Sequence, residues 1–366
     1  MKKIFALLLC LSMVFALVAC GGGEETLTDG SDASVDASTE TSTDTSSNTS
    51  TNTNGSWGDL PEDTVPNLVI ANDQIKERAV IYDLDAYEEG DTLDDLEVWS
   101  VPTGHAAGVK YREDTVFGDV VIVAGSQTSA IYKYPSKEVV WSTSNPGNNP
   151  HSIEILPSGN IVIANSTGNC LRVFSASAIL DGNKGVAQKF TDYTLKGAHG
   201  VLWDPEYEVL WALGGYELAA YAISGTGTGE KLSKVGGMGC DISKLGYGHD
   251  LQPDYTDTRY LYFTAGNAYR FDKEENKAGS FPQASTMQQK EIKGFSNNPN
   301  GNVFTTGPLG GAGKFFANSS KESWLTDTIY FFTKKVVKDR VVVTKNEFVS
   351  ESSAFYKVRA FYGQYQ

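Results

Sequence analysis

The chain has 366 residues, of which 40% are hydrophobic and 11% aromatic, and this is enough apolar sequence to build a sizeable core. Its formal net charge is −15 at pH 7, and much of that charge precedes residue 64, so the remainder of the chain is only mildly acidic. A nucleic-acid partner, which would require a basic face, is therefore not expected.

The N-terminus has the features of an export signal. Two lysines precede an apolar run, Ile4–Val18, which is too short to span a bilayer but suits a signal peptide. The run ends in Leu-Val-Ala-Cys at residues 17–20, which resembles the signal of bacterial lipoproteins. That resemblance implies a signal peptide over 1–19 and a lipid on Cys20, which would hold the protein at the extracytoplasmic face of the cell membrane by its acyl chains alone. The alternative is an ordinary secretion signal with an incidental cysteine.

A polar segment follows the predicted lipidation site. It is rich in Ser, Thr, Asn, Asp and Gly, has no Lys or Arg up to residue 54, and contains hardly any apolar residue. Such a segment cannot bury enough surface to offset the entropy lost on ordering. We therefore expect residues 20–60 to be a lipidated, disordered tether and residues 61–366 to be the folded domain.

The body of the chain is a series of short β-strand patterns broken by Gly, Asn, Asp and Pro, with no convincing amphipathic helix. One strand pattern recurs at Leu68–Asp73, Val121–Ser126, Ile161–Ser166, Val209–Gly214, Leu261–Gly266 and, more loosely, Asn302–Gly307. A second pattern follows each of these, at Ala79–Tyr82, Ala130–Lys133, Leu171–Phe174, Leu218–Tyr221, Ala268–Phe271 and Thr328–Phe331. With an opening and an outer strand added, each unit has four strands.

The repeat length predicts an all-β propeller, because a period of roughly 40–55 residues suits four-stranded blades and exceeds the period of β-solenoids. Six units can be counted, and the first lacks its opening strand. The C-terminal pattern Ala354–Phe361 can supply that strand and close the ring, which would remove two exposed sheet edges. A seven-bladed ring is the alternative. The sequence resembles the secreted six-bladed propellers of bacteria, whereas the blades do not repeat the Trp-Asp dipeptide of WD40 propellers.

Two cysteines, Cys170 and Cys240, remain in the predicted domain. An oxidising exterior would permit a disulfide, but the two residues fall in different repeats. Paired cysteines and two buried thiols both remain open.

The four histidines of the chain, His105, His151, His199 and His249, are separated by 46, 48 and 50 residues, which is the blade period. Each stands at the start of a predicted opening strand, the strand nearest the axis, so we expect them to converge at one mouth of the channel. Alignment of the turns Pro157–Asn160 and Pro299–Asn302 assigns Lys293 to the same position in a later blade. Lys357 and Arg359 of the closing strand are expected close by.

Three interpretations of this ring compete. The first is structural, since WD40 blades use a Gly-His pair in a hydrogen-bond network, although the repeated Trp-Asp partner is missing here. The second is a divalent metal held by three or four imidazoles, which Lys293 would oppose by its charge. The third is a site for an anionic ligand such as a uronate, which imidazoles and cations would bind. Tyr247, Trp203 and Tyr255 lie in or beside these segments and could stack on sugars, or belong to the blade core.

The resemblance extends to propeller families that cleave uronate-containing polysaccharides with histidine, tyrosine and basic residues at the channel mouth. It implies a β-elimination in which His151, His199 or His249 acts as base or acid and Tyr247 assists as acid. Lys293 or Arg359 would neutralise the carboxylate, and His105 would help to bind the ligand. The alternative is a non-catalytic receptor for a glycan or a surface protein. No carboxylate pair of a glycosidase and no Gly-x-Ser-x-Gly motif is present, and a monomer is expected.

Overall fold

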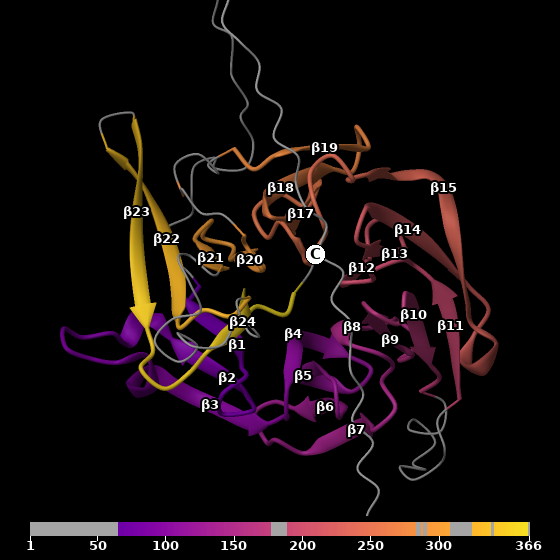
Figure 1. The fold of residues 1–366 in the computed structure, drawn as a ribbon, viewed down its shortest axis with the longest axis horizontal. Helices are drawn as coiled ribbons and strands as arrows, with labels where there is room; N and C mark the ends of the chain where they lie inside the picture. Colours follow the sequence, from indigo (N-terminus) through magenta and orange to yellow (C-terminus); the bar gives the residue numbers. More distant parts are fainter. Residues whose placement is uncertain are drawn as a thin grey trace, which may run out of the picture. The chain divides into compact units, whose positions relative to one another are not determined.

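The computed structural model describes residues 65–176, 189–282, 287, 291–307, 324–337 and 340–364. The predicted signal peptide, Cys20 and the predicted tether 20–60 lie outside these residues. The described chain is all-β and forms six four-stranded antiparallel sheets arranged as the blades of a propeller (Figure 1). The prediction of six blades is thereby confirmed and the seven-bladed alternative is wrong.

Each blade runs from an inner strand at the axis to an outer strand at the periphery. From the inside outward, blade 1 consists of β24 (Phe355–Ala360), β1 (Leu68–Asp73), β2 (Arg78–Asp83) and β3 (Glu97–Pro102). Blade 2 consists of β4 (Ala106–Thr115), β5 (Gly118–Gly125), β6 (Ser129–Lys133) and β7 (Val139–Thr143). Blade 3 consists of β8 (Pro150–Ile155), β9 (Ile161–Asn165), β10 (Cys170–Phe174) and β11 (Phe190–Thr194).

The second half of the ring repeats this order. Blade 4 consists of β12 (Gly200–Asp204), β13 (Val209–Leu213), β14 (Glu217–Ser224) and β15 (Lys231–Asp241). Blade 5 consists of β16 (Asp250–Pro253), β17 (Tyr260–Ala265), β18 (Asn267–Asp272) and β19 (Lys277–Ser280). Blade 6 consists of β20 (Gly294–Asn297), β21 (Val303–Thr306), β22 (Thr328–Val337) and β23 (Arg340–Val349).

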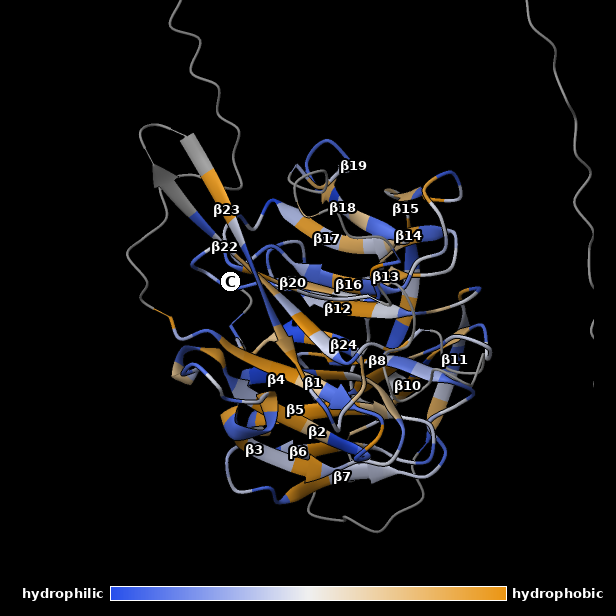
Figure 2. Ribbon diagram, turned by 60° about the vertical axis from the view of Figure 1, so that its left-hand side comes forward, coloured by the Kyte–Doolittle hydropathy of each residue, from blue (hydrophilic) through white to orange (hydrophobic). Residues whose placement is uncertain are grey.

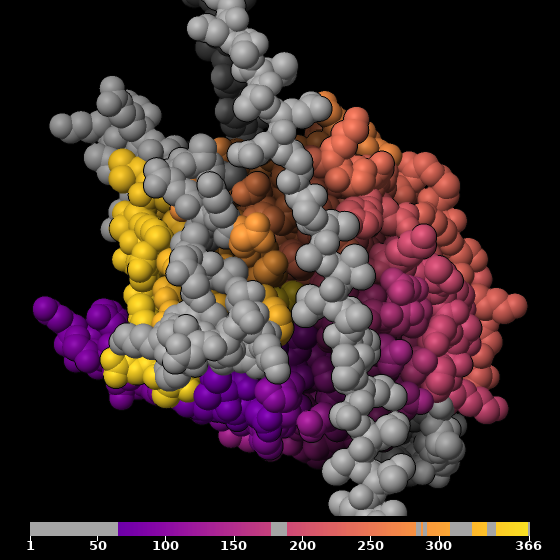
Figure 3. Space-filling view, in the orientation of Figure 1, coloured from indigo at the N-terminus to yellow at the C-terminus, as the bar shows by residue number. Residues whose placement is uncertain are grey.

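The ring is closed by the C-terminal strand, as predicted. β24 pairs antiparallel with β1, so that Val69 lies opposite Ala360 and Ile70 opposite Arg359. The first and last parts of the described chain therefore meet in one blade. In the space-filling view, yellow C-terminal atoms lie against indigo atoms of the N-terminal part (Figure 3). Because β24 occupies the inner edge of β1, blade 1 has the same four strands as the other blades and presents no unpaired edge at the axis.

The apolar core consists of six main clusters, one between each pair of neighbouring blades. Between blades 4 and 5, for example, Trp211 packs against Phe271 with ring centroids 5.4 Å apart. Strands such as β4 and β5 accordingly carry long apolar stretches (Figure 2). Burial of each large side chain contributes about 1.5–3 kcal/mol, so the blades are held to one another mainly by these faces.

Two glycines on the inner strands allow the blades to approach closely at the axis. A Cβ on Gly108 would lie 2.5 Å from the carbonyl oxygen of His151, and a Cβ on Gly294 would lie 2.8 Å from the backbone nitrogen of Val358. Both contacts are shorter than a side chain tolerates. The small residues in the predicted opening strands therefore mark the places where neighbouring inner strands touch.

Three short 3-10 helices, η1 (Leu84–Ala86), η2 (Leu93–Leu96) and η3 (Gly227–Gly229), complete the named elements. In the part of the chain that the structure describes, no helix has the length and apolar character needed to cross a membrane.

Both cysteines of the domain are free thiols and each is half-buried. Burial is the main reason why the pKa of the Cys240 thiol is raised to about 11, and it raises the pKa of Cys170 as well. Both side chains therefore stay in the protonated, unreactive form near neutral pH.

Candidate functional site

Three of the predicted site residues occupy one equivalent position at the start of successive inner strands. The backbone N–H groups of His199, His249 and Lys293 each donate to a carbonyl of the neighbouring strand at 2.8 Å, with acceptors Leu213, Thr264 and Thr306. The structure thus confirms the alignment, because Lys293 occupies the same position in its blade as His199 and His249 do in theirs. His151 has the corresponding place in β8, at a register shift between Pro150 and Ser152.

The other two blades fill this position with different residues. In β4 the register shift lies between Ala106 and Gly108, so Ala107 has the place that His151 has in β8. In β24 the shift includes Tyr356, whose ring contacts that of His151 with a centroid distance of 5.6 Å. The observed ring of side chains is therefore Ala107, His151, His199, His249, Lys293 and Tyr356.

His105 does not belong to this ring, and the expectation that four histidines converge is wrong in this respect. Like His199 it directly precedes its strand, but the register shift in β4 gives the axial position to Ala107 instead. The His105 side chain is 52% exposed and its Nε2 lies 3.1 Å from a carboxylate oxygen of Glu77. The even spacing of the histidines conceals this offset between His105 and the axial position.

The three remaining imidazoles pack against one another. The ring centroids of His151 and His199 are 4.1 Å apart, and those of His199 and His249 are 5.3 Å apart. Tyr247 lies beside them, 5.2 Å from His199 and 5.7 Å from His249 between centroids. We call His151, His199, His249, Lys293 and Tyr247 the histidine mouth.

Tyr247 can take this place because the residues that its ring packs against, Gly197 and Gly215, are glycines. A Cβ on Gly215 would lie 2.5 Å from the Tyr247 ring, and Gly197 has φ +60°, which favours glycine. Tyr247 is 37% exposed, and Tyr216, also exposed, contacts it edge to face with 5.3 Å between ring centroids. An accessible aromatic surface thus borders the three imidazoles.

Hydrogen bonds fix which nitrogen of each imidazole carries the proton. Nδ1 of His151 lies 3.0 Å from the Asn149 carbonyl and Nδ1 of His199 lies 2.8 Å from the Gly197 carbonyl. A carbonyl only accepts, so both Nδ1 atoms donate and, in the neutral rings, both Nε2 atoms are acceptors. In His249 the roles are reversed, because Nε2 accepts from the Lys293 ammonium at 2.9 Å. Its Nδ1–H is buried and has no hydrogen-bond partner among the described residues.

All three imidazoles are neutral at neutral pH. Burial, together with the charge of Lys357, lowers the pKa of His199 to about 3. Burial and the adjacent Lys293 lower the pKa of His249 to about 2, and burial lowers that of His151 in the same direction. Burial also lowers the pKa of the Lys293 ammonium. The carboxylate of Glu291, 3.8 Å away, acts in the other direction and raises that pKa. The positive charge of the histidine mouth therefore comes from lysine.

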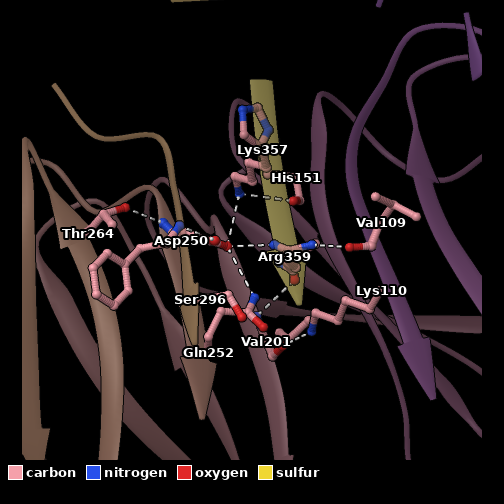
Figure 4. A network of polar contacts seen from close by, with 12 residues as sticks. Val109, Lys110, His151, Val201, Asp250, Gln252, Thr264, Ser296, Lys357 and Arg359 are labelled. Carbon is pink, nitrogen blue, oxygen red and sulfur yellow. Dashed lines mark hydrogen bonds and ion pairs between the residues drawn. The ribbon is translucent and has the colours of Figure 1, made fainter. Parts of the chain in front are cut away.

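Below the histidine mouth the channel is filled by a buried charged network (Figure 4). Arg359 donates to Asp250 at 2.5 Å and to the carbonyl of Val109. Lys357 lies 3.6 Å from the same carboxylate and donates to the His151 carbonyl at 3.3 Å. Arg359, which the sequence suggested as a cation at the rim, is thus only 2% exposed and its charge is compensated by Asp250.

A second pair of cations lies deeper in the channel. The guanidinium of Arg112 binds both carboxylate oxygens of Glu154, at 2.9 and 2.7 Å, and Lys110 reaches the same carboxylate at 3.0 Å. These cations hold the pKa of Glu154 at about 2, whereas burial lowers the pKa of Lys110 to about 7. Sequence reasoning missed this network. The feature that could have indicated the network is a charged residue at an inward position of an otherwise apolar opening strand.

A pocket of about 390 Å³ opens beside His249 and Tyr247. It is also bordered by Asn267, the first residue of β18, and by Glu291, which lies in the connection between blades 5 and 6. Within the described ranges, no group of three or more His, Cys, Asp or Glu side chains is placed to hold a metal ion. Lys293, which donates to His249, and Lys357 also place two cations beside the imidazoles, with Asp250 as an anionic neighbour of His199.

The fold and this site define an all-β six-bladed propeller with a mouth lined by histidine and lysine. Over residues 39–320 the sequence matches DUF6528, a family of unknown function, and the chain belongs to that family. Comparison with curated proteins finds no significant match.

Three solved structures are similar to this chain at low sequence identity. A protein of unknown function from Bacteroides caccae is 13% identical with a TM-score of 0.45, covering 66% of this chain and 82% of its own. A functionally unknown protein from Desulfotomaculum acetoxidans DSM 771 is 11% identical with a TM-score of 0.45, covering 81% and 100%. A chain of the mitotic checkpoint complex is 12% identical with a TM-score of 0.42, covering 63% and 65%.

Proposed function

We propose that this protein is a cell-surface lipoprotein that binds an anionic, uronate-type glycan at the histidine mouth. The observation that carries the proposal is the fixed set of donors and acceptors there. Lys293 and the unpartnered Nδ1–H of His249 are donors suited to a carboxylate. The Nε2 atoms of His151 and His199 are acceptors suited to hydroxyl groups. A sugar acid presents both kinds of group on one ring.

The surroundings of the mouth support a sugar rather than a simple anion. The exposed faces of Tyr247 and Tyr216 offer a surface on which a pyranose ring can stack. The adjoining pocket of about 390 Å³ lies within the range of small-ligand sites. A monomer bearing one such mouth is the expected binding unit.

The cellular location is part of the same proposal. The lipoprotein-like sequence at residues 17–20 supports a lipid on Cys20, and the polar tether would let the propeller reach a glycan outside the cell. Replacing Cys20→Ser should release the protein from the membrane fraction and abolish incorporation of a labelled fatty acid. Unchanged membrane association of this variant would contradict the anchor.

Binding can be tested by calorimetry with an oligogalacturonate and with a neutral oligogalactose of the same length. We expect the acidic oligosaccharide alone to bind, and Lys293→Met to weaken it at least tenfold. Lys234→Met is the matched control, because Lys234 pairs with Glu217 on the surface of blade 4. Equal binding of both oligosaccharides, or undiminished binding by Lys293→Met, would refute the proposal.

Cleavage by β-elimination is a second candidate, favoured by the contact between His199 and Tyr247. The unprotonated Nε2 of His199 would take the proton next to the carboxylate, while Lys293 stabilises the negative charge that forms. The carbon–oxygen bond to the leaving sugar would then break, and the leaving oxygen would take a proton from Tyr247. An ultraviolet band from the unsaturated product, lost in His199→Gln, is the expected result. Binding without that band would identify a receptor.

A further inference from the structure

The channel has a second opening at the far ends of the inner strands. A cavity of about 550 Å³ is formed there by the ends of β4 and β8, with Trp203 of β12 on one wall. The sequence grouped Trp203 with the aromatic residues near the histidines, whereas the structure places it at this opposite mouth. We call the cavity the tryptophan mouth.

The floor of the tryptophan mouth carries no free charge. It is made by Arg112 and Glu154, which are both buried and joined by two hydrogen bonds. The third nitrogen of the guanidinium donates to the carbonyl of Tyr111 at 2.9 Å. The only cation among the lining residues is therefore committed to the protein itself, so it offers little to an anionic ligand.

The walls are apolar and include one large aromatic face. Trp203 is half-buried against the core between blades 3 and 4, and it lines the cavity with Pro157, Pro205, Val116 and Leu156. Val116 is 50% exposed although it is an aliphatic side chain. The apolar stem of a ligand would gain free energy here, because its contacts with these walls remove apolar surface from water.

The rim is negative. Glu113 and Asp114 line the cavity, and Asp119 accepts a hydrogen bond from the backbone of Asp114 at 3.1 Å. Burial and the neighbouring Asp119 raise the pKa of Glu113. Within the described residues none of these three carboxylates forms a salt bridge. The uncompensated charge at this mouth is thus opposite in sign to that of Lys293.

We propose that the tryptophan mouth binds an ammonium group carried on an apolar stem, as in the lysine side chain of a peptide. The ammonium would lie over the face of Trp203 and beside Glu113, and the stem would contact the apolar walls. A cation on an aromatic face gains most where water is partly excluded, as it is in this cavity. The site is independent of the glycan proposed for the other mouth.

The test uses the whole protein and three peptides, namely trilysine, trialanine and triglutamate. We expect trilysine alone to bind in calorimetry and to change the tryptophan fluorescence. Trp203→Leu should abolish the fluorescence change and weaken binding at least tenfold, whereas Trp203→Phe should retain most of the affinity. Glu113→Gln, which removes the charge and keeps the size of the half-buried side chain, should weaken binding severalfold.

The outcome is separable from that of the histidine mouth. Lys293→Met should leave trilysine binding unchanged, and Glu113→Gln should leave oligogalacturonate binding unchanged. Absence of trilysine binding at millimolar concentration, equal binding of triglutamate, or full affinity in both Trp203→Leu and Glu113→Gln would overturn the proposal.

Discussion

The two mouths of the channel are built on the same inner strands but differ in the charged groups that line them. At the histidine mouth the cation is the ammonium of Lys293, which Glu291 faces from 3.8 Å, among imidazoles that burial keeps neutral. At the tryptophan mouth the rim carries the carboxylates of Glu113 and Asp114. Between them lies a layer in which each carboxylate is bound by two cations. The charges of this middle layer are therefore bound to one another, and the groups open to a ligand lie at the ends.

The largest effect is expected from breaking the middle layer. Glu154→Gln would leave Lys110 and Arg112 buried without a counter-charge, which should lower the free energy of unfolding by about 3–5 kcal/mol. Urea denaturation of the variant measures this loss. A change below about 1 kcal/mol would show that water reaches these cations and that the two mouths are not separated.

A second prediction concerns acid and the histidine mouth. The pKa of His199 is about 3 in the folded protein against an ordinary value near 6.5, so below pH 6.5 the unfolded chain binds a proton that the folded chain does not. Stability is therefore lost as pH falls, by about 1.4 kcal/mol per pH unit for this residue. At pH 5 the replacement His199→Gln should recover about 2 kcal/mol relative to its effect at pH 7.

Measurement of this effect requires denaturation curves at both pH values. His105→Gln is the matched control, since its side chain is exposed and lies outside the ring. An equal pH dependence in wild type and His199→Gln would contradict the neutral, buried state assigned to that imidazole.

A smaller effect is expected from removing the cation of the histidine mouth. Burial makes the charged form of Lys293 costly, so Lys293→Met should change stability by less than about 1 kcal/mol even though it removes a charge. Because Lys293 is the main charged neighbour that lowers the pKa of His249, that pKa should rise in the variant. Histidine resonances followed by NMR during a pH titration would detect the rise, and an unchanged titration would argue against the contact.

The smallest effect is expected at a surface ion pair. Lys234 and Glu217 are joined on blade 4 with about half of each side chain exposed. Lys234→Met should cost about 0–1 kcal/mol in the same urea experiment, because solvent screens exposed pairs. A loss as large as that of Glu154→Gln would remove the distinction between the compensated interior and the surface.

The sequence was sufficient for the blades because their strands repeat, and it located Lys293 through a repeated turn. It failed for His105 because the register shift in β4 leaves no mark in the spacing of the histidines. It also failed for Tyr356, since the closing strand has no turn with which to align. Charge pairs such as Arg112 with Glu154 join the inner strands of successive blades, and the strand pattern does not indicate which side chains of the two strands will meet.

The closing strand makes the integrity of the site depend on completion of the chain. β24 contributes Tyr356 to the ring of side chains, and Lys357 and Arg359 to the network beneath it. A polypeptide that stops before residue 354 would lack an edge of the first sheet and would leave Asp250 buried without its cations. A chain without residues 354–361 therefore cannot form the complete ring of side chains or the charged network beneath it.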